Sequence, residues 1–249
     1  MLSTVGEYFQ QFSAQRDVLT RTQQLRLRNS TVHVAGLGGI GFHVAMFLSE
    51  IGIGSITAND PQKIEIDNLN RIPLASITNI GTPKARLIAH VLRQRPHSVA
   101  VVEAKSEEAC AKALQRSADL LICCSNTYSS RVACARTAID TGKPLIDAGL
   151  CDARRGFVAG LRVFDPAKRS EACPICTIGD AQPKHADDRI FGPLAGIAGA
   201  IAVHLAMRRL IGARSSADSP NFLQLNLGTL TITTMRVLRN PRCPICRHR

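Results

Sequence analysis

Residues 31–51 read TVHVAGLGGIGFHVAMFLSEI. A short β-branched run, Thr31 to Ala35, leads into a glycine-rich turn, and a periodic apolar stretch follows over 42–51. This order predicts a strand, a tight turn and a helix. The glycines of the turn are Gly36, Gly38, Gly39 and Gly41. Because a Cβ at these positions would hold an anion away from the backbone N–H groups, the turn indicates a phosphate-binding loop. The alternative is a tight strand-to-helix turn that binds nothing.

Strand and helix signals continue to alternate after this turn. Residues 55–59 predict a second strand that ends at Asp60, and a helix is expected after Pro83. Further apolar runs and helical patterns alternate at 99–104, 107–117, 120–124, 129–141 and 145–148. Strands that alternate with helices imply a parallel sheet with right-handed crossovers. The predicted fold class is therefore α/β, with a doubly wound, mostly parallel, Rossmann-like sheet.

The pattern changes after residue 150. Residues 156–164 resemble a strand with no helix behind it, and residues 222–238 alternate apolar and polar side chains, as an antiparallel pair does. A helix rich in glycine and alanine is expected at about 193–212, and its apolar length suits burial or a subunit interface. We expect one domain over 1–249, with a nucleotide-binding half over 1–150 and a substrate-side, antiparallel half over 151–249.

Composition narrows the class of protein. The chain has 249 residues, of which 45% are hydrophobic and 20% charged, so disordered and low-complexity classes are excluded. Lys and Arg number 31 against 19 Asp and Glu, and the net charge of +12 favours anionic partners without choosing among them. The amino-terminal residues have neither a basic start nor an apolar run, and no stretch of about 18 uncharged apolar residues occurs. We expect neither secretion nor a membrane span.

The cysteines indicate a metal site. There are nine, an odd number, and two lie inside an apolar run, which is unlike a secreted disulfide framework and indicates a reducing cytoplasm. Four of them form two identical Cys-Pro-Ile-Cys pairs, at Cys173 and Cys176 and at Cys243 and Cys246. Two such pairs fit tetrahedral Zn²⁺ with a filled coordination shell, so the site is predicted to be structural. Disulfide pairing is the alternative.

Three side chains near the glycine turn favour nucleotide transfer over hydride transfer. An acid about 20 residues after a glycine turn binds a ribose in dinucleotide folds, and Asp60 lies close to that spacing. Arg71 and Lys84 flank Gly81-Thr82-Pro83, where the two cations can converge on a polyphosphate. A dehydrogenase has little need of both. Each cation alone reads as a solvated surface charge, so only the combination supports the nucleotide hypothesis.

Over most of its length, from about Gln15 to Cys246, the chain resembles the ubiquitin-activating-like adenylyltransferases of the ThiF/MoeB/HesA family. The matching pieces are the glycine turn, Asp60, Asp67-Asn-Leu-Asn-Arg71, Gly81-Thr-Pro-Lys84-Ala, the segment 119–131, Gly142-Lys-Pro-Leu, the segment starting Gly192-Pro-Leu-Ala-Gly and both cysteine pairs, in order. Many pieces in register are more specific than any single one.

This resemblance implies ATP, Mg²⁺ and structural Zn²⁺ as cofactors. It also implies that Asp60 holds the ATP ribose, that Arg71 and Lys84 hold the phosphates, and that Asn68 belongs to the nucleotide site. An arginine near the amino terminus would reach into the partner subunit of a homodimer. Arg16 is the candidate for that arginine, and Arg21 is nearly as good.

One position departs from the family pattern. The family usually has Thr-Asp-Asn followed by an arginine, whereas this chain has Ser125-Asn126-Thr127 with Arg131 retained. Asn126 therefore stands where the resemblance places an Asp close to magnesium and the phosphates. An amide oxygen lacks a charge, so Mg²⁺ should bind more weakly unless another carboxylate, such as Asp147, compensates. Either adenylation continues with altered metal handling, or the chain is a nucleotide-binding subunit that lost catalysis.

The resemblance implies that a substrate carboxylate attacks the α-phosphorus of ATP, that pyrophosphate leaves and that an acyl adenylate remains. Many relatives then pass the acyl group to a cysteine in the loop before the late helix, but the corresponding loop here, 177–191, contains none. Cys151 is the nearest alternative, and a packed or solvent-facing thiol is the favoured interpretation of it. The acyl adenylate is then expected to react directly with an external sulfur or amine nucleophile.

The expected substrate is the carboxyl terminus of a small ubiquitin-like or sulfur-carrier protein, or of a ribosomally made peptide. Activation of a carboxylate on tRNA is an alternative that the basic charge suggests and the paired cysteines disfavour. NAD-dependent dehydrogenation is the last alternative.

Overall fold

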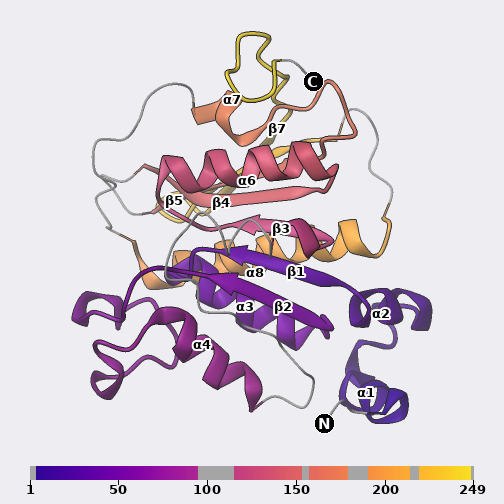
Figure 1. Ribbon diagram of the computed structural model, residues 1–249, viewed down its shortest axis with the longest axis vertical. Coiled ribbons are helices and arrows are strands. Elements are labelled where there is room, and N and C mark those ends of the chain that lie inside the picture. Colours follow the sequence, from indigo (N-terminus) through magenta and orange to yellow (C-terminus); the bar gives the residue numbers. More distant parts are fainter. Residues whose placement is uncertain (1–3, 95–114, 153–156, 179–189, 214–218, 248–249) are drawn as a thin grey trace.

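Seven strands form one sheet in the described part of the chain, in the order β2-β1-β3-β4-β5-β6-β7 (Figure 1). The computed structural model describes residues 4–94, 115–152, 157–178, 190–213 and 219–247, without the side chains of 151–152. The strands are β1 (Thr31–Ala35), β2 (Ser55–Asn59), β3 (Leu120–Cys123), β4 (Leu145–Asp152), β5 (Val158–Phe164), β6 (Phe222–Asn226) and β7 (Thr231–Met235).

The direction of the strands changes at β5. The pairs β2–β1, β1–β3 and β3–β4 are parallel, whereas β4–β5, β5–β6 and β6–β7 are antiparallel. The predicted α/β fold, with a mostly parallel sheet and an antiparallel extension, is confirmed. The predicted strand at 99–104 and most of the predicted helix at 107–117 lie outside the described residues, and only 115–117 of that helix are seen to be helical.

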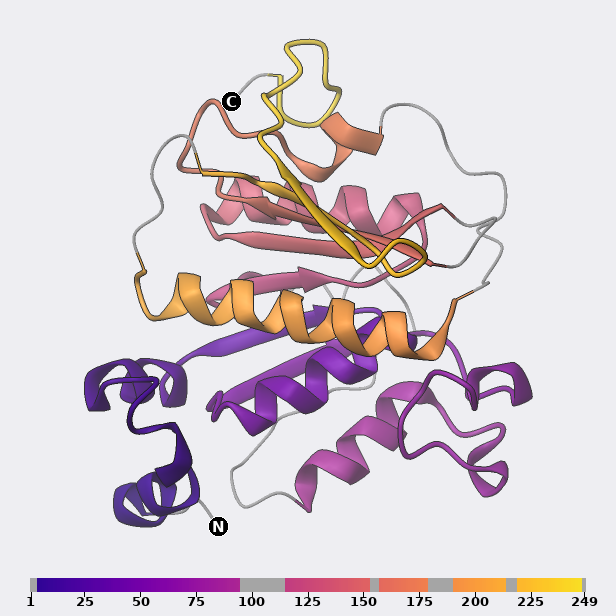
Figure 2. The same cartoon turned by 180° about the vertical axis from the view of Figure 1, so that it is seen from behind.

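Helices cover both faces of the sheet. On one face, α3 (Gly39–Glu50) packs against α8 (Gly192–Leu210), and α4 (Lys84–Arg93) joins the same apolar cluster (Figure 2). Small residues allow α3 and α8 to approach closely, since a Cβ on Gly199 would lie 2.9 Å from the Cβ of His43. On the opposite face, α6 (Tyr128–Thr141) covers β3 and β4 over a second cluster (Figure 1). One face of the late helix is thus buried against α3 and the sheet, while residues such as Ile197 and His204 are exposed.

The amino-terminal helices lie beyond the start of β1, at the end of the strand opposite to the glycine turn (Figure 1). They are α1 (Val5–Gln11) and α2 (Arg21–Arg28), with the 3₁₀ turn η1 (Ser13–Gln15) between them. Capping boxes begin both helices, from Thr4 with Glu7 and from Thr20 with Gln23. The buried Tyr8 hydroxyl donates a hydrogen bond to the carbonyl of Gly52 and attaches this pair to the domain.

One short helix was not predicted. Residues 173–188 are polar and contain proline and glycine, yet α7 (Pro174–Ile178) is helical. Proline at the first position of a helix has a suitable φ and loses no hydrogen bond, so Pro174 starts this turn well. Two further 3₁₀ turns, η2 (Ile66–Asn68) and η3 (Ile77–Asn79), lie in the predicted polar loop after β2. No helix in the described residues has the length and apolar character that crossing a bilayer requires.

Candidate functional site

A cavity of about 530 Å³ opens where the parallel strands end. Ligands of open α/β sheets bind at this edge, beyond the carboxyl ends of the strands. Its lining comprises Gly36, Gly38, Gly39, Ile40, Asn59–Gln62, Asn68, Arg71, Ile72, Lys84, Cys124–Tyr128, Ser130, Arg131, Gly149, Leu150, Arg162, Thr177, Ile178 and Ile190. The pocket therefore joins the predicted nucleotide-binding residues to residues of the antiparallel half.

The glycine turn needs its glycines. Gly36 has φ +91°, and a Cβ there would lie 2.8 Å from the backbone nitrogen of Ser125. A Cβ on Gly41 would lie 1.8 Å from the carbonyl oxygen of Gly36. Gly41 thus permits the close approach of the backbone within the turn. It does not line the pocket, whereas Gly36, Gly38 and Gly39 do. With α3 starting at Gly39, the helix amino terminus faces the cavity, a position suited to an anion.

Asp60 lies beside this turn and is held by the backbone. One carboxylate oxygen accepts a hydrogen bond from the N–H of Leu37 at 2.6 Å, and the other accepts from the N–H of Gln62 at 2.8 Å. The residue is 6% exposed. Each oxygen retains acceptor capacity, and the carboxylate lines the pocket where the predicted ribose contact requires it.

Asn68 and Arg71 come from the turn η2 and the residues after it. The side-chain oxygen of Asn68 closes a local turn by accepting from the N–H of Glu65, and its amide donates to Asp67. The guanidinium of Arg71 lies 3.2 Å from the carboxylate of Asp67 and donates to the side chain of Asn70. These contacts fix the arginine at the wall of the pocket.

Lys84 is the most informative cation of the pocket. It is the first residue of α4, it is 6% exposed, and its Nζ donates to the side-chain oxygen of Gln62 at 2.7 Å. In the described residues no carboxylate lies within ion-pair distance of this ammonium. A buried charge without a counterion is costly. The position therefore favours an anionic ligand in the cavity.

Asn126 lines the pocket from the loop between β3 and α6, whose amino-terminal cap is Thr127. The role suggested for Asp147 is not supported. That carboxylate is fully buried behind the pocket, where its oxygens accept hydrogen bonds from Arg131 and Arg162. Among the lining residues that the structure describes, Asp60 is the one carboxylate, and both of its oxygens already accept backbone hydrogen bonds. These residues do not fit a Mg²⁺ ion held by protein carboxylates.

Arg16 follows η1 and is not among the lining residues of the pocket in its own chain. Arg21 starts α2, and its guanidinium lies 4.0 Å from the ring centroid of Phe9. The contribution of one of these arginines to the site of a partner subunit stays a prediction.

A polar trio that the sequence did not reveal supports the pocket wall at Asn59. The Nε2 atom of the fully buried His33 lies 2.9 Å from the side-chain oxygen of Asn59, and its Nδ1 lies 3.0 Å from the hydroxyl of Thr57. Because an amide oxygen only accepts, Nε2 carries the proton and Nδ1 accepts from Thr57. The signal available in the sequence was a histidine in the first predicted strand together with two polar residues, Thr57 and Asn59, in the second.

This trio predicts a pH dependence of stability. Burial lowers the pKa of His33 to about 4, below its value of about 6.5 in an unfolded chain. The unfolded state then binds more protons between these values, so the free energy of unfolding decreases as the pH falls from about 6.5 to 4, by up to about 3 kcal/mol. Urea unfolding at a series of pH values measures the slope. His33→Gln should reduce the slope of the unfolding free energy against pH, and His204→Gln, at an exposed position, should not. Equal slopes in the wild type and both variants would contradict the role of His33.

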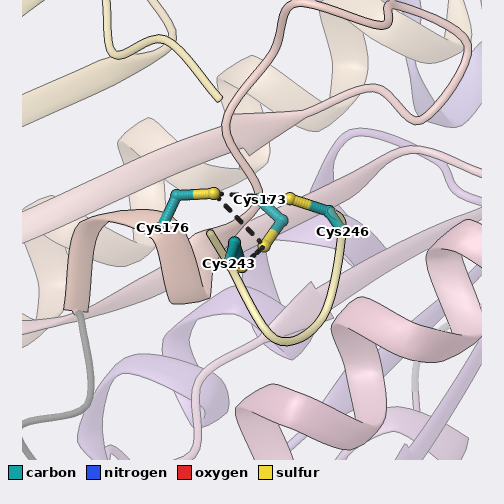
Figure 3. A group of neighbouring side chains, drawn as sticks. All are labelled: Cys173, Cys176, Cys243 and Cys246. Atoms are coloured by element: carbon teal, nitrogen blue, oxygen red, sulfur yellow. Dashed lines mark hydrogen bonds between the residues drawn. The ribbon is translucent and has the colours of Figure 1, made fainter. Parts of the chain in front are cut away.

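The four predicted zinc ligands gather in one group (Figure 3), which belongs to the same apolar cluster as the buried residues of α6. Cys173 and Cys176 flank the start of α7, and Cys243 and Cys246 lie in the turn near the chain end. Their sulfur atoms all lie within 4.8 Å of one another, with separations of 3.8, 3.6 and 3.4 Å for three of the pairs. Tetrahedral zinc with Zn–S bonds of about 2.3 Å requires sulfurs roughly 3.8 Å apart. The donor set and its geometry fit Zn²⁺.

The remaining described cysteines are packed. Cys123 in β3 and Cys134 in α6 are buried in the same apolar cluster, and Cys124 lies half-buried at the pocket. Burial raises the pKa of the Cys124 thiol, so this thiol is a poor nucleophile. Cys110, the side chain of Cys151 and most of the predicted crossover loop at 177–191 lie outside the described residues.

Comparison with known proteins agrees with this geometry. The sulfur carrier protein adenylyltransferase of Thermus thermophilus is 28% identical over 236 residues, which cover 90% of this chain and 84% of that protein. The adenylyltransferase and sulfurtransferase uba4 of Emericella nidulans is 26% identical, and the match covers 90% of this chain but only 49% of that protein. The crystal structure of E. coli MccB with AMPCPP and MccA has the same fold, with a TM-score of 0.77 at 21% identity over 98% of this chain and 75% of the other.

The sequence profile of the ThiF family matches residues 12–245, from the residues after α1 to the second cysteine pair. The chain therefore belongs to the ThiF family.

Proposed function

We propose that this protein is an ATP-dependent adenylyltransferase that activates a carboxylate as an acyl adenylate. The observation that carries the proposal is the buried, carboxylate-free ammonium of Lys84, which lines the same pocket as the glycine turn and Asp60. A cation in that position is stabilised by the phosphates of a nucleotide. Membership of the ThiF family and the name of the Thermus relative support the same reaction.

Different residues of the pocket bind different parts of the nucleotide. Asp60 accepts hydrogen bonds from the ribose hydroxyls, and Arg71 and Lys84 bind the phosphate oxygens. The substrate carboxylate attacks the α-phosphorus, the bond to the bridging oxygen breaks, and pyrophosphate leaves with the electron pair. The two cations stabilise the charge that develops on the leaving group, and the alignment of the reactants supplies much of the acceleration. No protein nucleophile takes part in this step.

The substrate that we propose is the carboxyl terminus of a small sulfur-carrier or ubiquitin-like protein, or of a peptide. On the side of β4 and β5, across the sheet from β2, the pocket is lined by Leu150 and Arg162, with the buried Arg131 from α6 and Ile178 from α7, a surface suited to an extended chain terminus. We also propose a single adenylation domain that acts as a cytoplasmic homodimer, with Zn²⁺ at the four cysteines and Arg16 contributed to the partner's site.

ATP–pyrophosphate exchange tests the proposal. Small sulfur-carrier proteins and peptides with a free terminal carboxylate are assayed beside the same molecules with a terminal carboxamide, which cannot attack phosphorus. We expect exchange with at least one free carboxylate and none with its carboxamide. If ATP is consumed without exchange, the reaction does not form an acyl adenylate by attack at the α-phosphorus.

Asn126 supports a second candidate function. The exposed amide replaces a charged ligand at the pocket, and no neighbouring carboxylate compensates for it in the described residues. A subunit that binds ATP for a partner chain without adenylating anything would have these features. It binds ATP but gives no exchange alone, and exchange appears only with the partner.

The Asn126→Asp variant separates the two functions. A carboxylate at this position adds a charged magnesium ligand next to the phosphates. The concentration of Mg²⁺ that gives half-maximal exchange should then fall by about tenfold, which corresponds to ~1.4 kcal/mol. Ser129→Asp places the same charge on the exposed first turn of α6, outside the pocket lining, and is the control. An unchanged magnesium requirement in Asn126→Asp would remove this position from the metal site.

A further inference from the structure

The metal cluster and the substrate end of the pocket are joined by one residue. Thr177 directly follows the ligand Cys176 in α7 and also lines the pocket. Its hydroxyl donates to the carbonyl of Pro174 at 2.7 Å and accepts a hydrogen bond from Nε of Arg162. Thr177 is thus fixed from the side of the cysteine cluster and holds an arginine that reaches it from β5.

Arg162 is held on its other side by Asp147. The two residues are directly opposite in the antiparallel register of β4 and β5, and Nη1 of Arg162 donates to the carboxylate at 3.0 Å. The same carboxylate accepts from Arg131, so one negative charge serves two guanidinium groups. This cluster carries an excess positive charge at the floor of the pocket.

One edge of Arg162 remains for a ligand. Its Nε donates to Thr177 and its Nη1 to Asp147, and Nη2 has no hydrogen-bond partner among the described residues. This nitrogen is not one of the fully buried, unpartnered atoms, and Arg162 lines the pocket from β5, across the sheet from β2. The free edge of the guanidinium is therefore available to a ligand on that side of the cavity.

A single hydrogen bond to Asp147 does not fix the plane of a guanidinium, because the group can rotate about that contact. A second bond at Nε defines the plane, and a planar donor set in one orientation recognises oxygen acceptors with high geometric specificity. The ring of Phe222, 5.0 Å from the guanidinium carbon, limits movement on a further side. The hydrogen bond at Nε comes from Thr177 in α7, the helix that also contains the cysteine Cys176.

We propose that Arg162 binds the carbonyl oxygens of the acyl substrate and that Thr177 is the positioning residue that orients it from the four-cysteine cluster. The cluster thereby supports substrate binding as well as the fold. This inference rests on the proposed adenylation, which supplies an acyl group at this end of the pocket. It adds two residues that neither the glycine turn nor the cysteine pairs indicate.

The test compares two ligands that share a nucleotide. AMP occupies the nucleotide end alone, whereas glycylglycyl-sulfamoyl adenosine, a stable mimic of an acyl adenylate, also places carbonyl oxygens at the acyl end. Their affinities are measured by calorimetry on the full-length, zinc-loaded protein. Thr177→Val keeps the shape of the side chain and removes the hydroxyl, and Thr177→Ser restores the hydroxyl. Zinc content and thermal unfolding are measured for every variant.

We expect Thr177→Val to weaken the acyl-adenylate mimic about tenfold, as the loss of an orienting bond to a charged group does, and to leave AMP binding within about twofold. Thr177→Ser should recover the affinity. Arg162→Gln should weaken the mimic similarly, and the double variant should be no weaker than Arg162→Gln alone. If Thr177→Val alters both ligands equally or neither, the inference is wrong. If the wild-type protein binds neither ligand, the proposed function fails first.

Discussion

Replacing Lys84 by alanine should lower the rate of ATP–pyrophosphate exchange by about two to three orders of magnitude, the usual effect of removing one preorganised charge from a transition state. The lysine is buried, it lies at the start of α4, and its partner in the described chain is the neutral side chain of Gln62. Its charge is therefore available to the phosphates. Exchange is measured at saturating carboxylate substrate and over a range of ATP concentrations.

The neighbouring exposed Lys63 provides the control, since it lies outside the lining of the pocket. Lys63→Ala removes one positive charge, as Lys84→Ala does. It should leave the exchange rate within about twofold of the wild type, as surface substitutions usually do. Thermal unfolding of both variants shows whether they are folded. A folded Lys84→Ala protein with normal exchange would remove the lysine from the catalytic machinery.

Loss of one zinc ligand should strongly destabilise the protein. Cys243→Ser removes a buried sulfur from a cluster whose two pairs are 70 residues apart in the chain. Loss of a bound metal belongs to the most destabilising class of changes, so we expect about 4 kcal/mol or more. For a domain of this size that corresponds to a fall in melting temperature of roughly 10 °C.

Zinc analysis and thermal unfolding in the presence of a thiol reductant measure this effect. Arg242→Ala changes the exposed neighbour of the ligand and should retain both the zinc and the melting temperature. A chelator should destabilise the wild-type protein, and a reductant should not. The opposite sensitivity, to reductant and not to chelator, would indicate disulfides in place of zinc.

The strands of the sheet were largely predictable because their signals are local. The β-branched run at β1, the glycines after it and the alternation that predicts β6 and β7 each occupy a short stretch of chain. The helix α7 was missed because five residues are too few to show a helical period.

The nucleotide end of the candidate site was predictable for the same reason. Asp60, Arg71 and Lys84 lie within one loop and its flanking elements, and the structure brings them to one cavity. The acyl end was not predictable, because Arg162 and Thr177 meet only through the register of β5 and the fold of α7. The burial of Asp147 also depends on that register, and this burial does not support its suggested role in binding magnesium. Arg16 depends on a second chain.

The pocket at the glycine turn is expected to bind ATP. Calorimetric titration of ATP into the zinc-loaded protein tests it most directly, with Lys84→Ala titrated in parallel. We predict saturable binding at one site per chain that Lys84→Ala weakens. The absence of ATP binding by folded, zinc-containing protein, with or without Mg²⁺, a carboxylate substrate or a partner chain, would contradict the account.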